Sequence, residues 1–159
     1  MLDLMSTAWN HIVSKADADK LLDVFGGFHD GCLREVHIWT QSWVAPDLRM
    51  QCASDLDTRI RFYVQRQFRD PSAIELLFEQ VVGFHLQPSA QNYDSIIFGA
   101  TLLFDGDIIC WADADGWSPT DDKRDGVTWI AAKKAAWRDA SDWMGADLHY
   151  GAHDDTHEV

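Results

Sequence analysis

Two apolar runs on either side of a short acidic turn constrain this sequence more than any other feature. The runs IIFGATLLF and IICWADA are separated by Asp105-Gly106-Asp107. An Asp-Gly pair between apolar runs is a strong hairpin signal, because both turn residues tolerate a positive φ. We therefore predict a β-hairpin over 96–113, and with it a mainly antiparallel β structure.

Alternation with a period of two extends this prediction along the chain. Residues 48–56 and 59–68 each place apolar side chains at every second position, which is typical of half-buried strands. The alternating residues are Leu48, Met50, Cys52 and Leu56 in the first segment and Ile60, Phe62, Val64 and Phe68 in the second. The short Asp57-Thr58 junction predicts that the two segments form a hairpin.

Two further segments remain open between strand and helix. Segment 74–86 fits a strand through six residues at period two, and it also fits a helical stripe that Ser72 and Glu75 would cap. The strand set is Ile74, Leu76, Phe78, Val82, Phe84 and Leu86. Segment 127–138 begins as a strand, VTWIA, but AAKKAAWRDA contains good helix formers and could continue as a helix.

The N-terminal region predicts a helix over about 6–25, with apolar stripes around Trp9 and Leu21. Gly26-Gly27 should end it, because glycine readily takes the left-handed conformation of a C-terminal cap. The predicted fold class is therefore mainly β: an antiparallel curled sheet, barrel or sandwich of about six or seven strands over about 30–138, with an N-terminal helix.

Length and composition predict one soluble domain. At 159 residues the chain can bury one good core, which we place in residues 1–144, and no apolar run is long enough to cross a membrane. Asp3 stands where a signal peptide would carry a basic residue, and three widely spaced cysteines argue against a disulfide framework. These are Cys32, Cys52 and Cys110. We expect a cytoplasmic location.

The net charge is strongly negative, at −13. A field of that sign disfavours nucleic acid as a partner and is compatible with a basic protein. Residues 139–159 contain six acids and no lysine or arginine. Within them we expect the acidic, histidine-containing tail 145–159 to be frayed.

Two groups of residues have a metal-like spacing. His149, His153 and His157 would line one face of a helix, but no apolar face is present to hold such a helix. The stretch WADADGWSPTDD offers four carboxylates without the glutamate that closes a calcium loop. These are Asp113, Asp115, Asp121 and Asp122. We read the stretch as a solvated loop and expect no metal or cofactor.

The motif Phe28-His29-Asp30-Gly31 lies where the helix should end and the first strand begin. His29 beside Asp30 could form an acid/base pair, but adjacent side chains on an extended chain point apart. We expect a structural role instead. Phe28 would anchor the junction in the core, Asp30 would bond nearby backbone amides, and His29 would be satisfied locally.

Eight tryptophans are many for a chain of this size, and most should fill the core. Trp39 and Trp43 flank the end of the first strand, and Trp117 lies within the acidic loop. Aromatic residues rimmed by acids are typical of a protein-binding hot spot. We therefore name Trp39, Trp43, Asp113, Asp115, Trp117, Asp121 and Asp122 as candidate binding residues.

The GGFHDGCLREVHI segment, the pattern IxLxFxxVxxFxL over 74–86 and the acidic Trp-Ala-Asp after an IIC strand together resemble a group of small bacterial proteins. These share an FHD element ahead of an all-β domain and include immunity proteins of polymorphic toxin systems. The likeness spans roughly 28–138. It implies a binding protein that neutralises a toxin, and it favours strands over 74–86 and 127–138.

Three functions follow as hypotheses. The first is a non-enzymatic protein-binding domain, immunity-like, with a basic protein such as a toxin as its partner. The second is a small-ligand or divalent-metal-binding β-barrel protein or enzyme, with His29 or His85 acting beside Asp113 and Asp115 at the barrel mouth. The third is a homodimeric module that meets its copy through sheet edges or tryptophans.

Overall fold

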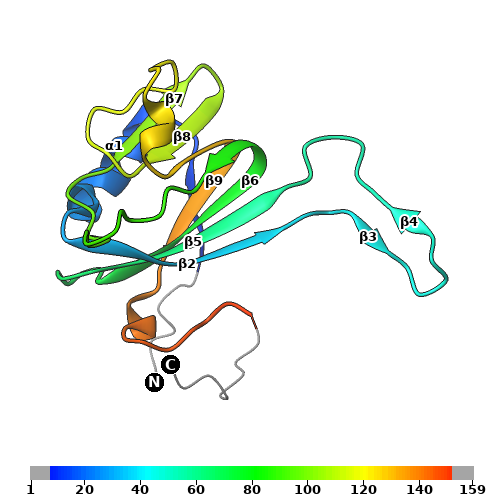
Figure 1. Ribbon diagram of the computed structural model, residues 1–159, viewed down its shortest axis with the longest axis horizontal. Coiled ribbons are helices and arrows are strands. Elements are labelled where there is room, and N and C mark those ends of the chain that lie inside the picture. The colour runs from blue at the N-terminus through cyan, green and yellow to red at the C-terminus, as the bar shows by residue number, and fades with distance from the viewer. Residues whose placement is uncertain (1–7, 152–159) are drawn as a thin grey trace.

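The computed structural model describes residues 8–151, which form one large sheet, a small separate sheet and one α-helix (Figure 1). The helix α1 spans Lys15–Val24. The strands are β1 (Asn10–Ile12), β2 (Gly31–Trp39), β3 (Trp43–Val44), β4 (Met50–Gln51), β5 (Arg59–Arg66), β6 (Ala73–His85), β7 (Thr101–Asp105), β8 (Ile108–Ala112) and β9 (Trp129–Asp139).

The large sheet has seven antiparallel strands in the order β2-β5-β6-β9-β8-β7, with β1 on the same edge of β9 as β8. Strands β3 and β4 pair only with each other. The mainly β prediction is confirmed, and the curled sheet is the correct form of it. The sheet is not closed into a barrel. The hypothesis of a site at a barrel mouth is therefore wrong in its architecture, because the fold has no barrel mouth.

The core lies between one face of the sheet and α1. Phe28, Phe62 and Trp111 meet there edge to face, with ring centroids 5.4 to 5.6 Å apart. Leu21 of α1 and Phe78 of β6 are fully buried in the same cluster. No helix of residues 8–151 has both the length and the apolar surface to cross a bilayer.

The predicted helix over 6–25 is wrong in its first half. Residues Asn10–Ile12 form β1, which pairs with β9, and residues 6 and 7 lie outside the described part of the chain. Ile12 is 3% exposed and the next residue, Val13, is 78% exposed. Successive side chains that face opposite sides in this way are typical of an extended chain. The helix starts later because Ser14 caps it in a capping box with Asp17.

The predicted stop of the helix at the glycine pair is confirmed. Gly26 and Gly27 have φ values of 57° and 64°, which other residues rarely adopt. A Cβ on Gly26 would also lie 2.9 Å from the guanidinium of Arg66. That buried guanidinium donates to the carbonyl of Val24 at 3.3 Å and packs over Phe25, so it fixes the end of α1.

Both open segments are strands, β6 and β9, and they pair along most of their length. The core-facing positions step by two and then by three at the same place on both strands. On β6 they are Ile74, Leu76, Phe78 and Val81, and on β9 they are Ile130, Ala132 and Ala135. Gln80, at this break, has a positive φ, and a bulge follows between Val81 and Gly83. Val82, which period two places in the core, is therefore exposed, and Leu86, which follows the last residue of β6, is exposed as well.

The predicted hairpin of 48–56 with 59–68 is wrong. Strand β5 pairs with β2 and β6, and only Met50–Gln51 of the first segment is a strand. The 96–113 hairpin is confirmed as β7 and β8, with Gly106 at φ 62° in the turn, although its first strand begins at Thr101.

Candidate functional site

Residues 40–58 connect β2 to β5 and form an arm that projects beyond the large sheet (Figure 1). The arm consists of the short β3–β4 hairpin and its two connecting segments. Four of its large apolar side chains face solvent rather than the core. They are Trp43 (59% exposed), Val44 (53%), Leu48 (83%) and Met50 (65%). Apolar side chains gathered on a projection are typical of an interaction surface.

The tip of the arm holds an apolar residue in an unfavourable backbone conformation. Leu48 has a φ of 70°, in the left-handed region where a bulky side chain is an outlier. The turn is held by hydrogen bonds from Leu48 N to Ala45 O at 2.8 Å and from Ala45 N to Arg49 O at 2.9 Å. Strain of this kind is often found in functional segments.

Polar contacts join the two connecting segments of the arm to each other at its base. Ser42 Oγ donates to Asp57 Oδ2 at 2.7 Å, and Gln41 N donates to Asp57 O at 3.1 Å. Next to them the Arg61 guanidinium lies 5.5 Å from the ring of Trp39. This cation–π contact holds Trp39 half-buried at the root of the arm. Two of the predicted binding residues are thus close to each other in the chain: Trp43 lies in the arm and Trp39 at its root.

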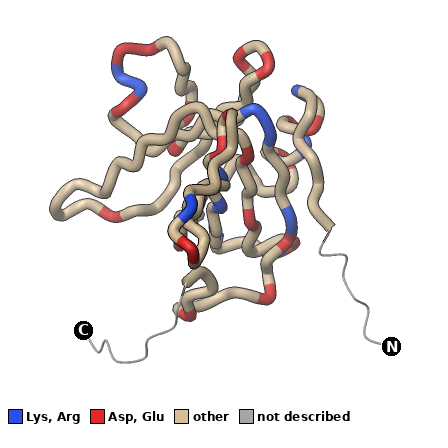
Figure 2. The backbone as a smooth tube through the Cα atoms, turned by 90° about the vertical axis from the view of Figure 1, so that its right-hand side faces the viewer, with Lys and Arg blue, Asp and Glu red and all other residues tan. Residues whose placement is uncertain are grey.

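The predicted acidic residues lie elsewhere, in the loop between β8 and β9, which Figure 1 places away from the arm. Asp115, Asp121 and Asp122 are exposed there. The expectation that Trp117 forms a surface with them is wrong. Its ring is buried against Trp129, with centroids 5.8 Å apart, and its Nε1 donates to Arg124 O at 3.1 Å. Figure 2 shows acidic residues spread over strands and loops alike rather than gathered on one face.

Asp113 differs from the other acids of this loop because it is half-buried. Desolvation by burial raises the pKa of its carboxyl group from 3.8 to about 6. The folded protein therefore holds this proton more tightly than the unfolded chain does, and stability falls as the pH rises between those two values. Ionised Asp113 is a cost to folding at neutral pH.

We expect Asp113→Asn to raise the free energy of unfolding at neutral pH by about 1 kcal/mol, after discounting for partial solvent exposure. At about pH 4.5 the gain should fall by more than half, because the folded wild type is then mostly protonated at this site. Urea unfolding at both pH values measures it, with exposed Asp115→Asn as the matched control. An equal gain at both pH values would rule out titration of Asp113 as the cause.

Phe28 of the Phe28-His29-Asp30 motif anchors the core as expected, but the Nδ1 partner of His29 is distant in sequence rather than local, and among residues 8–151 the Asp30 carboxylate accepts no backbone amide. Phe28 is fully buried in the core, and His29 Nδ1 lies 2.8 Å from Phe98 O, within hydrogen-bonding distance. The expectation that the His29 and Asp30 side chains point apart is wrong. Asp30 has a φ of 56°, and its Oδ2 lies 3.5 Å from His29 Nε2. A left-handed residue breaks the alternation that an extended chain would give.

The sheet face opposite the core carries a buried ionic network that the sequence analysis did not identify. The side chain of Glu75 on β6 is completely buried. Its Oε1 accepts from Arg138 Nε at 2.6 Å, its Oε2 accepts from the Tyr150 hydroxyl at 2.6 Å, and Arg61 Nη1 lies 3.8 Å away. Burial, and next the hydrogen bond to Glu75, raises the pKa of Tyr150, which keeps its hydroxyl a donor.

This network fastens the C-terminal segment 141–151 to the sheet. The Glu35 carboxylate accepts hydrogen bonds from the backbone amides of His149 and Tyr150 at 2.9 to 3.1 Å. The Tyr63 hydroxyl donates to the carbonyl of Trp143. The expectation of a frayed tail from residue 145 is therefore wrong as far as residue 151. An available signal was the row of polar residues on β5, Arg61 and Tyr63 among them, facing away from the core.

Of the three tail histidines with a metal-like spacing, only His149 lies within the described residues. The ring of His149 stacks on Trp143 at 4.7 Å between centroids, while His153 and His157 lie outside the described residues. Among residues 8–151, no cluster of three or more histidine, cysteine or acidic side chains is arranged to hold a metal ion.

His85, the other histidine of the enzyme hypothesis, has Nε2 at 3.3 Å from Gln87 Oε1. Comparisons of the chain with family models, with curated proteins and with solved structures find no match.

Proposed function

We propose that this protein is a non-enzymatic binding domain that contacts a protein partner through the arm. The observation that carries the proposal is the exposure of Trp43 and Leu48 on a projection anchored to a rigid sheet. Interfaces derive most of their affinity from a few large apolar or aromatic side chains that enter pockets on the partner. A tip held by the hydrogen bonds of Leu48 and Ala45 would lose little conformational freedom on binding.

The charge of the arm favours a basic partner. Residues 40–58 contain three acids and one arginine, and that residue, Arg49, is already paired with Asp47 at 2.7 Å. The whole chain carries a net charge of −13, which would speed its encounter with a positively charged protein. The complementary surface on the partner is an apolar pocket with lysine or arginine at its rim.

A toxin is the partner that we propose. The resemblance of residues 28–138 to FHD-motif proteins supports this choice, because that group includes toxin-neutralising immunity proteins. Such a protein would work by covering a functional surface of the toxin, and it would need no catalytic residue of its own. A basic toxin encoded beside this chain is the partner to test first.

The test is the affinity of the purified partner for an arm variant with Trp43→Ser and Leu48→Ser. Two central apolar contacts contribute about 2 kcal/mol each, so the dissociation constant should rise by roughly 1,000-fold. The melting temperature should stay within about 2 °C of the wild type, because both side chains are exposed in the free protein.

Tyr93→Ser is the matched control, since Tyr93 is also a large exposed side chain but lies outside the arm. It should leave the affinity unchanged. Equal affinity of the arm variant and the wild type would overturn the proposal. A partner that proves to be a second copy of the chain, detected as a dilution-dependent size, would favour the homodimeric module over toxin binding.

A further inference from the structure

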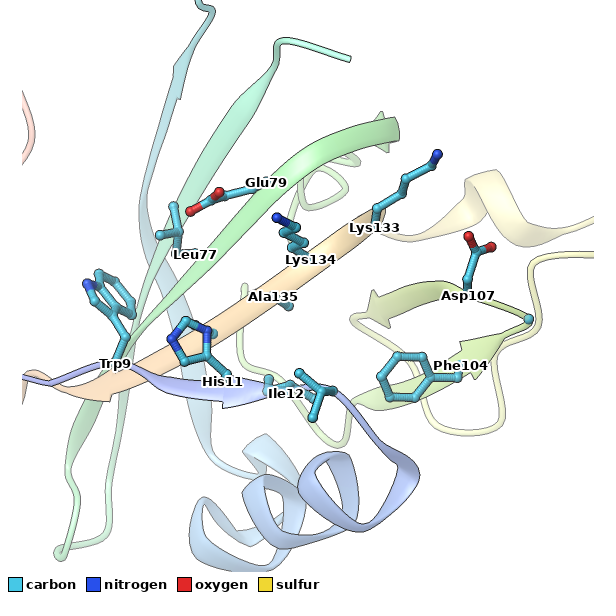
Figure 3. A pocket seen from close by; sticks show the side chains of 13 residues that line it. Trp9, His11, Ile12, Leu77, Glu79, Phe104, Asp107, Lys133, Lys134 and Ala135 are labelled. Atoms are coloured by element: carbon cyan, nitrogen blue, oxygen red, sulfur yellow. The ribbon is translucent and has the colours of Figure 1, made fainter. Parts of the chain in front are cut away.

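A groove of about 660 Å³ lies beside β9, at the junction of β1 with the β7–β8 hairpin (Figure 3). This volume is within the range of pockets that hold small ligands. The groove is not part of the arm, because its lining comes from the segment around β1, from β6 and β9, and from the β7–β8 turn. The proposed protein-binding function does not use it.

The groove exists because two strands share one edge of β9 without meeting. Strand β8 pairs with β9 from Trp129 to Ala132, and β1 pairs with it from Ala135 to Trp137. Lys133 and Lys134 lie between these stretches, and within residues 8–151 neither β1 nor β8 pairs with them. Their segment of the sheet edge is left open toward the groove, with backbone groups available to a ligand.

The two lysines supply positive charge without ionic partners. Both are exposed, and neither Lys133 nor Lys134 forms an ion pair with any residue between 8 and 151. Figure 3 shows them above the floor of the groove, extending in different directions. In a chain with twice as many acids as bases, two adjacent unpaired lysines beside a groove are a local exception to the overall charge.

Two acids also line the groove, and they reduce this charge only in part. Glu79 lies opposite Lys134 on β6, and its carboxylate is 4.0 Å from the Arg59 guanidinium, which offsets its charge. Asp107 is in the exposed turn between β7 and β8. The charge of Arg59 offsets that of Glu79, which leaves the two lysines and Asp107. The lining then has a net charge of about +1, which favours a single negative charge on the ligand.

The rest of the lining is apolar. Ile12 and Ala135 are buried at the groove, while the half-buried rings of Trp9 and Phe104 stand on either side of it (Figure 3). His11 projects between the two rings and adds one further hydrogen-bonding group. A ligand that fits must therefore combine an apolar body with one anionic group.

We infer that the groove binds a small amphipathic monocarboxylate, with the carboxylate at Lys133 and Lys134 and the apolar body between Trp9 and Phe104. The lysine ammonium groups donate hydrogen bonds to the carboxylate, and the aliphatic or aromatic body of the ligand covers the floor of the groove. Binding is reversible and involves no covalent step.

The experiment uses octanoate as the probe, with octylammonium and octanol as controls that keep the chain and change the head group. Titration of the full-length protein is followed by backbone amide and tryptophan indole chemical shifts. Octanoate should shift the amides of residues 133–135 and the indole of Trp9, and it should bind more tightly than either control. In the variant Lys133→Gln/Lys134→Gln, octanoate should bind roughly 3- to 30-fold more weakly, as expected for two partly screened charge contacts.

Octanol binding should be the same in the wild type and in this variant, which shows that the groove is intact. Lys15→Gln, which removes an exposed lysine of α1 paired with Asp19, should leave octanoate binding unchanged. Octylammonium binding as tightly as octanoate, unchanged octanoate affinity in the double variant, or shifts confined to residues outside the groove would each overturn the inference. None of these results depends on whether the arm binds a protein.

Discussion

Replacing Phe28 by alanine is expected to lower the free energy of unfolding by about 3–5 kcal/mol. Phe28 is completely buried, and its ring meets Phe25 at 5.0 Å and Trp111 at 5.6 Å between centroids. Truncation removes the aromatic contact that joins the end of α1 to strand β8, and it leaves a cavity lined by rigid rings. Chemical denaturation followed by tryptophan fluorescence measures the loss.

His29→Ala is the matched control for this change. It removes an exposed neighbour with one hydrogen-bonding contact, to the carbonyl of Phe98, and should cost about 1 kcal/mol or less. A loss for Phe28→Ala as small as that of His29→Ala would contradict the structural role assigned to the motif. Phe28 would then not be the residue that connects helix and sheet.

The second large effect is expected at the ionic network opposite the core. Arg138→Met should destabilise the protein by about 3 kcal/mol, because it leaves the Glu75 carboxylate buried without its closest cation. Arg61, at 3.8 Å, and the Tyr150 hydroxyl offset only part of the loss. Urea unfolding at neutral pH measures the change.

Arg59→Met provides the comparison, since Arg59 is on the same face but is 40% exposed and 4.0 Å from Glu79. It should cost about 0.5 kcal/mol or less. Equal losses for the two variants would mean that water reaches Glu75 and that the network does not fasten the C-terminal segment.

Local sequence signals predicted the elements whose conformation is decided locally. The β7–β8 turn at Gly106 and the glycine pair after α1 are examples, because each requires a positive φ that only some residues adopt easily. Strand β5 was also predicted, since Ile60, Phe62 and Val64 alternate without interruption.

The errors occur where long-range pairing decides the outcome. Leu48 and Met50 alternate as a half-buried strand would, but periodicity does not reveal whether another layer covers that face. Residues Asn10–Ile12 fit a helical pattern in the sequence, but they form a strand that pairs with the edge of β9. The matching three-residue steps of β6 and β9 at Gln80 depend on both strands at once, so neither strand alone predicts them.

The candidate site was predictable in part. Trp39 and Trp43 were selected for their place at the end of a strand and for their chemistry; Trp43 belongs to the arm, and Trp39 ends β2 at its root. Leu48 was assigned to a core instead, because an exposed leucine and a buried one look alike in a sequence. The docked tail was missed for another reason. Backbone amides of His149 and Tyr150 bind Glu35, and composition says nothing about backbone donors.

The most direct test of the proposed function is photo-crosslinking from the tip of the arm. A photoreactive phenylalanine analogue is introduced at Leu48 in one variant and at Tyr93 in another, since both side chains are exposed. Each variant is irradiated with the basic toxin that we propose as the partner. We predict a covalent adduct with the toxin from position 48 and none from position 93. Adducts from position 93 alone, or from neither position although the complex forms, would contradict binding through the arm.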